Sequence, residues 1–265
     1  MVGGDERALE LEKLLIQDGY EVDTLGLHTE ENAPIAQADA LLFPYPFSVR
    51  NDCVPAVNGL TMHPADILSQ TRKGIPVLAG RGMESYCTKE HPLKLYETVE
   101  SLLDANADIS AEAAAAHAMQ CTRKALMDMN VLVIGYGRFG RALARRLAAL
   151  QATVWVAARR REPRLLAAND GMHPAALDGM AAALRQADLV LNTVPARVLD
   201  EAHLRMLQPG VPLLELASAP YGFDRDVALA LGHPCEVLPA LPARYAPISA
   251  ALALRLAVNR LLSEE

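Results

Sequence analysis

The chain has 265 residues, 51% of them hydrophobic and 22% charged, which is enough length for about two domains with a substantial core. Its net charge of -7 argues against a general nucleic-acid-binding protein, and no apolar run approaches the ~20 residues of a membrane-spanning helix, so neither partner is expected. The cysteines and histidines are scattered without CxxC or HExxH spacing, so we expect reduced thiols, a cytoplasmic protein and no metal site.

The first half of the chain alternates between helix and strand patterns. Helices are predicted over residues 6–19 and 63–74, and strands over 20–26, 38–44 and 75–80. This rhythm predicts a small parallel sheet. Only Met1 and Val2 precede the first glycine turn, fewer than the about five residues of a typical strand, which leaves open a trimmed or misassigned start.

The second half alternates more regularly, after a long alanine-rich helix predicted over residues 109–129 with Ser110 as its N-cap. Strands are predicted over 130–135, 153–158, 188–194, 211–217 and 235–240. Helices are predicted over 138–150, 176–186, 200–208 and 225–231. The closing helix has apolar residues on more than one face, so we expect it to be buried; they are Leu252, Leu254, Leu256, Val258 and Leu261.

These elements predict an α/β protein with two Rossmann-like parallel-sheet domains joined by a long helix. We expect an N-terminal flavodoxin-like or Rossmann-like substrate domain over residues 1–108 and a linker helix over 109–129. The dinucleotide-binding domain then covers 130–246, and the C-terminal helix, 247–265, packs on the N-terminal domain or between subunits, with the former favoured.

A GxGxxG turn lies between a predicted strand and a predicted helix. Gly135 permits the tight turn, Gly137 lets backbone approach a pyrophosphate, and Gly140 lets the helix pack on the sheet. The first turn of the helix offers free N–H groups to phosphates. A glycine turn without a ligand is the alternative, and the strand–turn–helix–strand context favours a dinucleotide site. The turn residues are Gly135, Tyr136, Gly137, Arg138, Phe139 and Gly140.

Arginines follow the second strand of this unit, where an NAD-binding unit places an Asp or Glu for the ribose hydroxyls. Guanidinium groups instead suit the 2′-phosphate of NADP(H). We therefore favour NADP(H) as the cofactor, with Arg159 as its first partner and Arg160 as its second. The alternative is a solvated arginine turn, and we expect Arg161 and Arg164 to face water.

Residues that follow the later strands are further candidates, because ligands in open α/β sheets bind at the carboxyl ends of strands. Those at the end of the strand predicted over 188–194, and directly after it, border the ribose and nicotinamide: Asn192, Thr193, Val194 and Pro195. Those after the strands predicted over 211–217 and 235–240 are the catalytic candidates: Ser218, Tyr221 and Tyr245. Each has ordinary turn chemistry as its alternative, and no general base is assigned.

Five segments occur in the order MVGGDERALELEKLLIQDGYEV, VLVIGYGRFGRALARRLAALQATVWVAARR, ADLVLNTVPARVL, LLELASAPYGFD and LPALPARYAPISAA. Together they resemble the A subunit of dipicolinate synthase, along nearly the whole chain. The resemblance implies a sporulation enzyme on a branch of the lysine/diaminopimelate pathway. It implies NADP-linked oxidation of dihydrodipicolinate to dipicolinate, together with a flavoprotein-like B subunit, and we expect a homo-oligomer.

The chain departs from that family at two turns beside the expected substrate. It has SAPYG at 218–222 in place of an SRPGG-like turn, and ALPAR at 240–244 in place of a GLPG-like turn. Another NADP-linked imine or enoate oxidoreductase, or a non-catalytic NADPH-binding subunit, therefore stays open. A module without nucleotide is least favoured. A 2-hydroxyacid substrate is disfavoured, because the Arg and His of those dehydrogenases lack counterparts after the strands predicted over 211–217 and 235–240.

Oxidation to an aromatic pyridine requires little acid–base catalysis by side chains, because aromatisation itself favours loss of the hydride. The protein has to hold two carboxylates and orient the ring. The candidate carboxylate-binding residues carry hydroxyl, amide or guanidinium groups; they are Ser48, Arg50, Asn51, Ser218 and Arg244.

Overall fold

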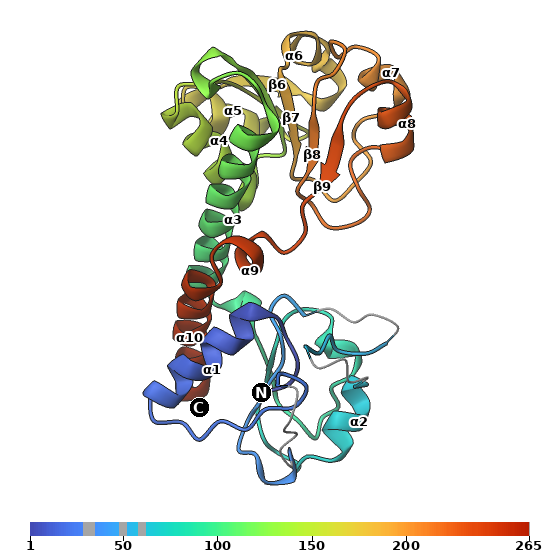
Figure 1. The fold of residues 1–265 in the computed structure, drawn as a ribbon. Helices are drawn as coiled ribbons and strands as arrows, with labels where there is room; N and C mark the ends of the chain where they lie inside the picture. Colours follow the sequence, from blue (N-terminus) through green and yellow to red (C-terminus); the bar gives the residue numbers. More distant parts are fainter. Residues whose placement is uncertain (29–34, 48–51, 58–61, 265) are drawn as a thin grey trace. The chain divides into compact units, whose positions relative to one another are not determined.

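The computed structural model describes residues 1–28, 35–47, 52–57 and 62–264, which form two compact units (Figure 1). Unit 1 comprises Met1–Asn106 and Pro242–Glu265, and unit 2 comprises Ala107–Leu241. The expected α/β class is confirmed, because each unit contains a parallel sheet with helices. The chain returns to unit 1 at Pro242, ahead of the expected boundary at 246. Leu241, directly before it, is the last residue that packs in the core of unit 2.

Unit 2 contains a six-stranded parallel sheet in the order β6-β5-β4-β7-β8-β9 (Figure 1). The strands are β4 (Asn130–Ile134), β5 (Thr153–Ala158), β6 (His173–Ala176), β7 (Leu189–Asn192), β8 (Leu213–Glu215) and β9 (Cys235–Val237). The helices between them are α4 (Arg138–Ala149), α5 (Arg161–Asn169), α6 (Ala181–Gln186), α7 (Glu201–Leu204) and α8 (Arg225–Ala230). The strand order reverses between β4 and β7, and this is where open α/β sheets bind ligands.

The central strand β4 is buried on both faces. Val131 and Val133 join the hydrophobic cluster on one side, which includes α4, while Leu132 and Ile134 join the cluster on the other side. This alternation follows from the two-residue period of a strand. The continuous apolar run VLVI is therefore what a central strand between two helical layers requires.

Two elements of unit 2 were not predicted, namely α5 and β6. The arginines before Pro163 resemble a turn in the sequence, but proline is tolerated in the first turn of a helix. Pro174 lies within β6, which is acceptable because β6 is an edge strand.

The long helix α3 (Glu100–Cys121) begins and ends earlier than the predicted 109–129, and the boundary between the units falls within it. Ser110 is buried in the helix interior and is not its N-cap. The prediction overshoots the end because Leu126 and Met129 turn into the unit 2 core, where the chain forms only a short 3₁₀ helix over Leu126–Asp128.

Unit 1 contains a three-stranded parallel sheet in the order β1-β2-β3. Its strands are β1 (Leu41–Leu42), β2 (Val77–Ala79) and β3 (Leu93–Leu95), and α2 (Pro64–Ser69) lies between β1 and β2. The predicted strand over 20–26 is reduced to a single parallel bridge between Leu25 and Val2. The Val2 N–H donates to the Leu42 carbonyl at 2.9 Å, so the start of the chain lies beside β1.

The C-terminal helix α10 (Pro247–Ser263) packs against α1 (Glu6–Gln17) within unit 1. The Arg255 guanidinium donates to both carboxylate oxygens of Asp18, and Asn259 Nδ2 donates to the same group at 2.9 Å. Leu252 and Leu256, expected to be buried, are 43% and 69% exposed, because only one face of α10, with Leu254, Val258 and Leu261, joins the core of unit 1.

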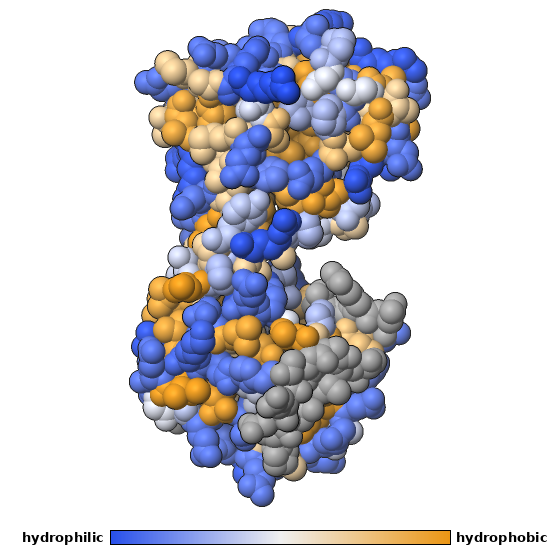
Figure 2. Space-filling view, viewed as in Figure 1, coloured by the Kyte–Doolittle hydropathy of each residue, from blue (hydrophilic) through white to orange (hydrophobic). Residues whose placement is uncertain are grey.

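The surface mixes hydrophobic and hydrophilic residues, as the face in Figure 2 shows. Across the described ranges, no helix has both the length and the apolar character needed to span a bilayer. The same ranges contain no group of three or more His, Cys, Asp or Glu side chains arranged to hold a metal ion.

Candidate functional site

The glycine turn of unit 2 joins β4 to α4, and its three glycines have different surroundings. Gly135 has a φ of +98°, and a Cβ at this position would lie 2.4 Å from Thr193 Oγ1. A Cβ on Gly140 would lie 2.3 Å from the Gly135 carbonyl oxygen. Gly137, by contrast, has no neighbouring atom within 4 Å of where its Cβ would be. Packing therefore requires two of the glycines, while the third faces open space.

That open space adjoins the N-terminus of α4. Gly137 is the N-cap of this helix and provides no side-chain hydrogen bond to it. N–H groups in the first turn of a helix have no intrahelical partner and attract anions, an effect that the helix dipole strengthens. The turn therefore has the shape and polarity that a pyrophosphate requires.

A cleft of about 620 Å³ opens beside this turn. Its walls are formed by the glycine turn, the end of β5, the start of α5 and the loop that follows β7. Of the predicted cofactor residues, those that line it are Gly135, Tyr136, Gly137, Arg138, Phe139, Gly140, Arg159, Arg160, Thr193, Val194 and Pro195. Lining residues that the sequence did not single out are Ala157, Ala158, Pro163, Leu177, Ala196, Arg197 and Val198. The position of the last three within the segment NTVPARVL was the only signal for them.

The arginines at the end of β5 differ in their roles. Arg159 and Arg160 are exposed at the cleft, and within the described ranges no carboxylate forms an ion pair with either. Arg161 is exposed and does not line the cleft. Arg164, which we expected to face water, is half-buried, because its Nη1 donates to the carbonyl oxygens of Ala158 (3.0 Å) and Arg159 (2.9 Å). It thereby fixes the backbone that carries the two cleft arginines.

Asn192 lies below the cleft and does not line it, although the sequence places it beside the ribose. Its side chain is fully buried, and Nδ2 donates to the Glu215 carboxylate (2.7 and 3.0 Å) and to the Val194 carbonyl (2.9 Å). Its Oδ1 accepts from the Val194 N–H at 3.1 Å. Asn192 therefore shapes the loop that lines the cleft.

Glu215 is the buried centre of this network and was not identified from the sequence. Besides Asn192, it accepts hydrogen bonds from the backbone N–H groups of Ala217 (3.0 Å) and Gly222 (2.7 Å). Burial raises the pKa of the Glu215 carboxyl, and the three donors oppose that rise. The Gly222 carbonyl in turn accepts from the N–H groups of Val198 (2.8 Å) and Leu199 (2.9 Å). One carboxylate thus joins the loops after β7 and β8.

The Tyr136 phenol is part of a polar cluster with Asp170. Its hydroxyl donates to Asp170 Oδ2 at 2.5 Å, and the same carboxylate accepts from Arg141 and Arg145. Hydrogen bonds from Arg145 and Tyr136 hold the pKa of Asp170 below its usual range, while burial raises the pKa of Tyr136. This cluster holds α4 against the end of α5.

The catalytic and substrate candidates are spread over both units. Ser218 and Tyr221 lie exposed on the loop after β8 in unit 2. Arg244 and Tyr245 belong to unit 1, on the short helix α9 (Leu241–Tyr245), and the Arg244 guanidinium lies 5.9 Å from the centre of the Tyr245 ring. The other three candidates lie outside the described residues: Ser48, Arg50 and Asn51.

Residues 95–231 match the family of the D-isomer specific 2-hydroxyacid dehydrogenase NAD-binding domain. The chain is 26% identical to the A subunit of dipicolinate synthase from Bacillus subtilis (strain 168), with 100% of this chain and 95% of that protein covered. The resemblance found in the sequence is thereby confirmed.

Solved structures of dipicolinate synthase A subunits are also similar to this chain. The crystal structure of the dipicolinate synthase A subunit from Bacillus halodurans has a TM-score of 0.87 at 26% identity, covering 100% of this chain and 97% of that one. The A chain of dipicolinate synthase from Bacillus subtilis gives 0.85 at 25% identity, covering 99% and 94%. A transhydrogenase from Sinorhizobium meliloti, 18% identical over 99% of this chain and 94% of its own, shares the fold with a TM-score of 0.69.

The open space at Gly137 and the N-terminus of α4 fit the pyrophosphate of a dinucleotide, and the matched domain is an NAD-binding one. The protein is an NAD(P)-dependent oxidoreductase with a nicotinamide dinucleotide as its cofactor. The match covers more than half of the chain and contains every residue that lines the cleft, and the chain belongs to the family of the D-isomer specific 2-hydroxyacid dehydrogenase NAD-binding domain.

Proposed function

We propose that the protein is the NADP-dependent subunit of a dipicolinate synthase and oxidises dihydrodipicolinate to dipicolinate. The similarity to the A subunit of dipicolinate synthase over 100% of the chain carries the choice of substrate. When bound, NADP⁺ accepts the hydride that the dihydropyridine ring loses, and one proton is released as the ring becomes aromatic.

The choice of NADP rests on the end of β5. Arg159 and Arg160 line the cleft, are exposed, and form no ion pair with a carboxylate of the described residues. The first carboxylate after the strand, Glu162, does not line the cleft. Two unpaired guanidinium groups beside an adenosine ribose favour a 2′-phosphate, whereas a carboxylate there would repel it.

The proposed substrate-binding and catalytic residues are those that the sequence singles out. We assign binding of the dicarboxylate to Ser48, Arg50, Asn51, Ser218 and Arg244, and the candidates for a catalytic role are Ser218, Tyr221 and Tyr245. We also propose a homo-oligomer that works with a flavoprotein-like B subunit. The four cysteines are all free, which suits a reducing compartment such as the cytoplasm.

The test is NADPH formation when dihydrodipicolinate is supplied enzymatically to the purified protein, with and without the flavoprotein-like partner. We expect NADPH absorbance to rise under at least one of these conditions. Tight NADPH binding without turnover in the assembled pair would instead favour a non-catalytic NADPH-binding subunit. Turnover of other cyclic imines or enoates, but not of dihydrodipicolinate, would favour a different oxidoreductase.

A further inference from the structure

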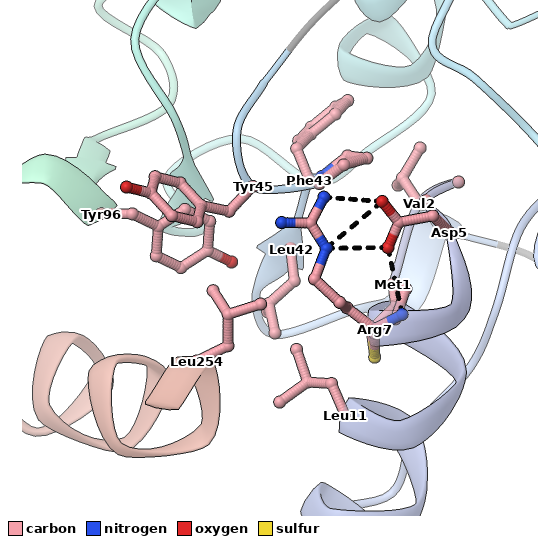
Figure 3. Close-up of a pocket in the computed structure, with 14 residues that line it drawn as sticks. Met1, Val2, Asp5, Arg7, Leu11, Leu42, Phe43, Tyr45, Tyr96 and Leu254 are labelled. Atoms are coloured by element: carbon pink, nitrogen blue, oxygen red, sulfur yellow. Dashed lines mark hydrogen bonds and ion pairs between the residues drawn. The ribbon is translucent and has the colours of Figure 1, made fainter. Parts of the chain in front are cut away.

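A small pocket lies in unit 1, at the carboxyl ends of its first strands (Figure 3). It is lined by the first five residues of the chain and the first half of α1, by the end of β1 and the residues after it, by Tyr96, which follows β3, and by Leu254 of α10. Its volume is about 20 Å³, room for a single oxygen atom of a ligand. Parallel α/β sheets bind ligands at this edge.

Arg7 brings a charged group to this pocket, although only 5% of the residue and 7% of its side chain are exposed. Its Nε donates to both oxygens of Asp5 (2.9 and 3.2 Å), and its Nη2 donates to Oδ2 at 2.6 Å. The third guanidinium nitrogen, Nη1, has no partner among the described residues. Figure 3 shows it directed away from Asp5, toward the side of the pocket where Tyr45 and Tyr96 lie. Asp5 thus fixes the guanidinium plane and leaves one pair of N–H donors for the pocket.

Tyr96 provides a second donor. The residue is 1% exposed, and none of the described residues forms a hydrogen bond with its hydroxyl. Figure 3 shows this hydroxyl pointing into the pocket, on the side of Arg7. Burial raises the pKa of Tyr96, so the phenol stays neutral and can donate a proton in a hydrogen bond. A hydroxyl on a residue with so little exposure has almost no access to water, so an acceptor that enters the pocket would give it a hydrogen-bond partner.

We propose that Arg7 and Tyr96 form a carboxylate-binding subsite, in which Arg7 Nη1 and the Tyr96 hydroxyl both donate to one carboxylate of the substrate. The pocket admits only the tip of that carboxylate, and the rest of the ligand stays outside it. Asp5 offsets much of the Arg7 charge, so the subsite recognises its ligand through directed hydrogen bonds rather than net charge. The inference deepens the proposed function, because it assigns a holder for one of the two carboxylates of a pyridine dicarboxylate.

The test is isothermal titration of the full-length protein, saturated with NADP⁺, against pyridine-2,6-dicarboxylate, isophthalate and malonate. Tyr96→Phe removes only the hydroxyl and keeps the ring, so its melting temperature should not fall. We expect this variant to bind the carboxylate at least about tenfold more weakly, since hydrogen bonds to charged acceptors are among the stronger ones. Arg7→Lys keeps the charge but has one nitrogen in place of three, so it cannot bind Asp5 and the ligand in the same geometry and should weaken binding similarly. Tyr20→Phe, at an exposed position of the same unit, is the matched control and should bind like the wild type.

The outcomes separate this subsite from the proposed function. Equal binding of pyridine-2,6-dicarboxylate by the wild type and Tyr96→Phe overturns the subsite and leaves the proposed function intact. Tyr96-dependent binding of isophthalate or malonate, without binding of pyridine-2,6-dicarboxylate, supports the subsite and contradicts the proposed substrate. If the wild type binds none of the three carboxylates, the subsite is overturned.

Discussion

Replacing Glu215 with glutamine tests whether one buried carboxylate holds the two loops beside the cofactor cleft. Every group that contacts Glu215 is a donor: the Asn192 amide and the N–H groups of Ala217 and Gly222, at 2.7 to 3.0 Å. A glutamine has the same shape but only one acceptor oxygen. Its NH₂ group would face another donor wherever it points.

The cost follows from these contacts. At least one backbone N–H or amide group loses its acceptor in a site with no exposed surface, and the new NH₂ group lacks one as well. Each unsatisfied buried group costs about 1–3 kcal/mol, so we expect Glu215→Gln to lower the free energy of unfolding by about 3 kcal/mol. The loop after β7 depends on the same network through Asn192 and Gly222, so the affinity for the dinucleotide should fall about tenfold as well.

Urea unfolding followed by circular dichroism measures the first effect, and titration with NADPH measures the second. The matched control is Glu201→Gln on α7, where an exposed pair with Arg205 should contribute less than about 1 kcal/mol. If the free energy of unfolding of Glu215→Gln lies within about 0.5 kcal/mol of the wild-type value, as it does for a surface substitution, Glu215 does not hold the two loops together.

Three further predictions concern the cleft and its supports. Arg159→Ala should lower the ratio of NADP affinity to NAD affinity at least about tenfold. Arg161→Ala, which changes a residue outside the cleft, should leave that ratio unchanged. Equal ratios in the two variants would refute the assignment of Arg159 to the 2′-phosphate. Gly135→Ala places a methyl group 2.4 Å from the Thr193 hydroxyl oxygen, whereas Gly171, which has a similar left-handed φ (+82° against +98°), has open space around it. Gly135→Ala should therefore lower the free energy of unfolding, measured by heat or urea, by about 1–3 kcal/mol more than Gly171→Ala does. Equal losses in the two variants would contradict the packing argument. Because the pKa of Asp170 is lowered in the folded protein, its ionised carboxylate contributes to the free energy of unfolding. That contribution is fully present above the ordinary Asp pKa of about 3.9 and is lost as the pH falls from there through the lowered pKa. The difference in unfolding free energy between the wild type and Asp170→Asn should therefore be constant near neutral pH and shrink in acid, and a difference that is flat across the whole range would contradict this account.

The sequence predicts the elements whose local pattern and tertiary role agree. The run VLVI followed by GYGRFG predicts a buried strand, a turn and a helix start, and β4 and α4 lie there because each of these signals is local. The lining of the cleft by the glycine turn and by Arg159 and Arg160 follows from the same reasoning, since the ends of parallel strands meet at one edge of a sheet.

What the sequence does not predict depends on contacts between distant residues. The Asn192 side chain is held below the cleft by its hydrogen bond to Glu215, which lies 23 positions later on the neighbouring strand. The end of α3 depends on Leu126 turning into the core, which overrides the local preference of an alanine-rich run for helix. The pocket of Arg7 and Tyr96 joins residues that are far apart in the chain and adjacent only in the folded unit.

The central claim, NADP-dependent oxidation of dihydrodipicolinate, is tested most directly by quantifying both products of one reaction. The complete protein, with its proposed flavoprotein-like partner, receives enzymatically generated dihydrodipicolinate and NADP⁺ with oxygen excluded, and dipicolinate and NADPH are measured chromatographically. We predict that the two appear in a one-to-one ratio, because each ring that becomes aromatic gives up one hydride. Dipicolinate formed at the same rate without NADP⁺, or no dipicolinate above the enzyme-free rate, would contradict the account.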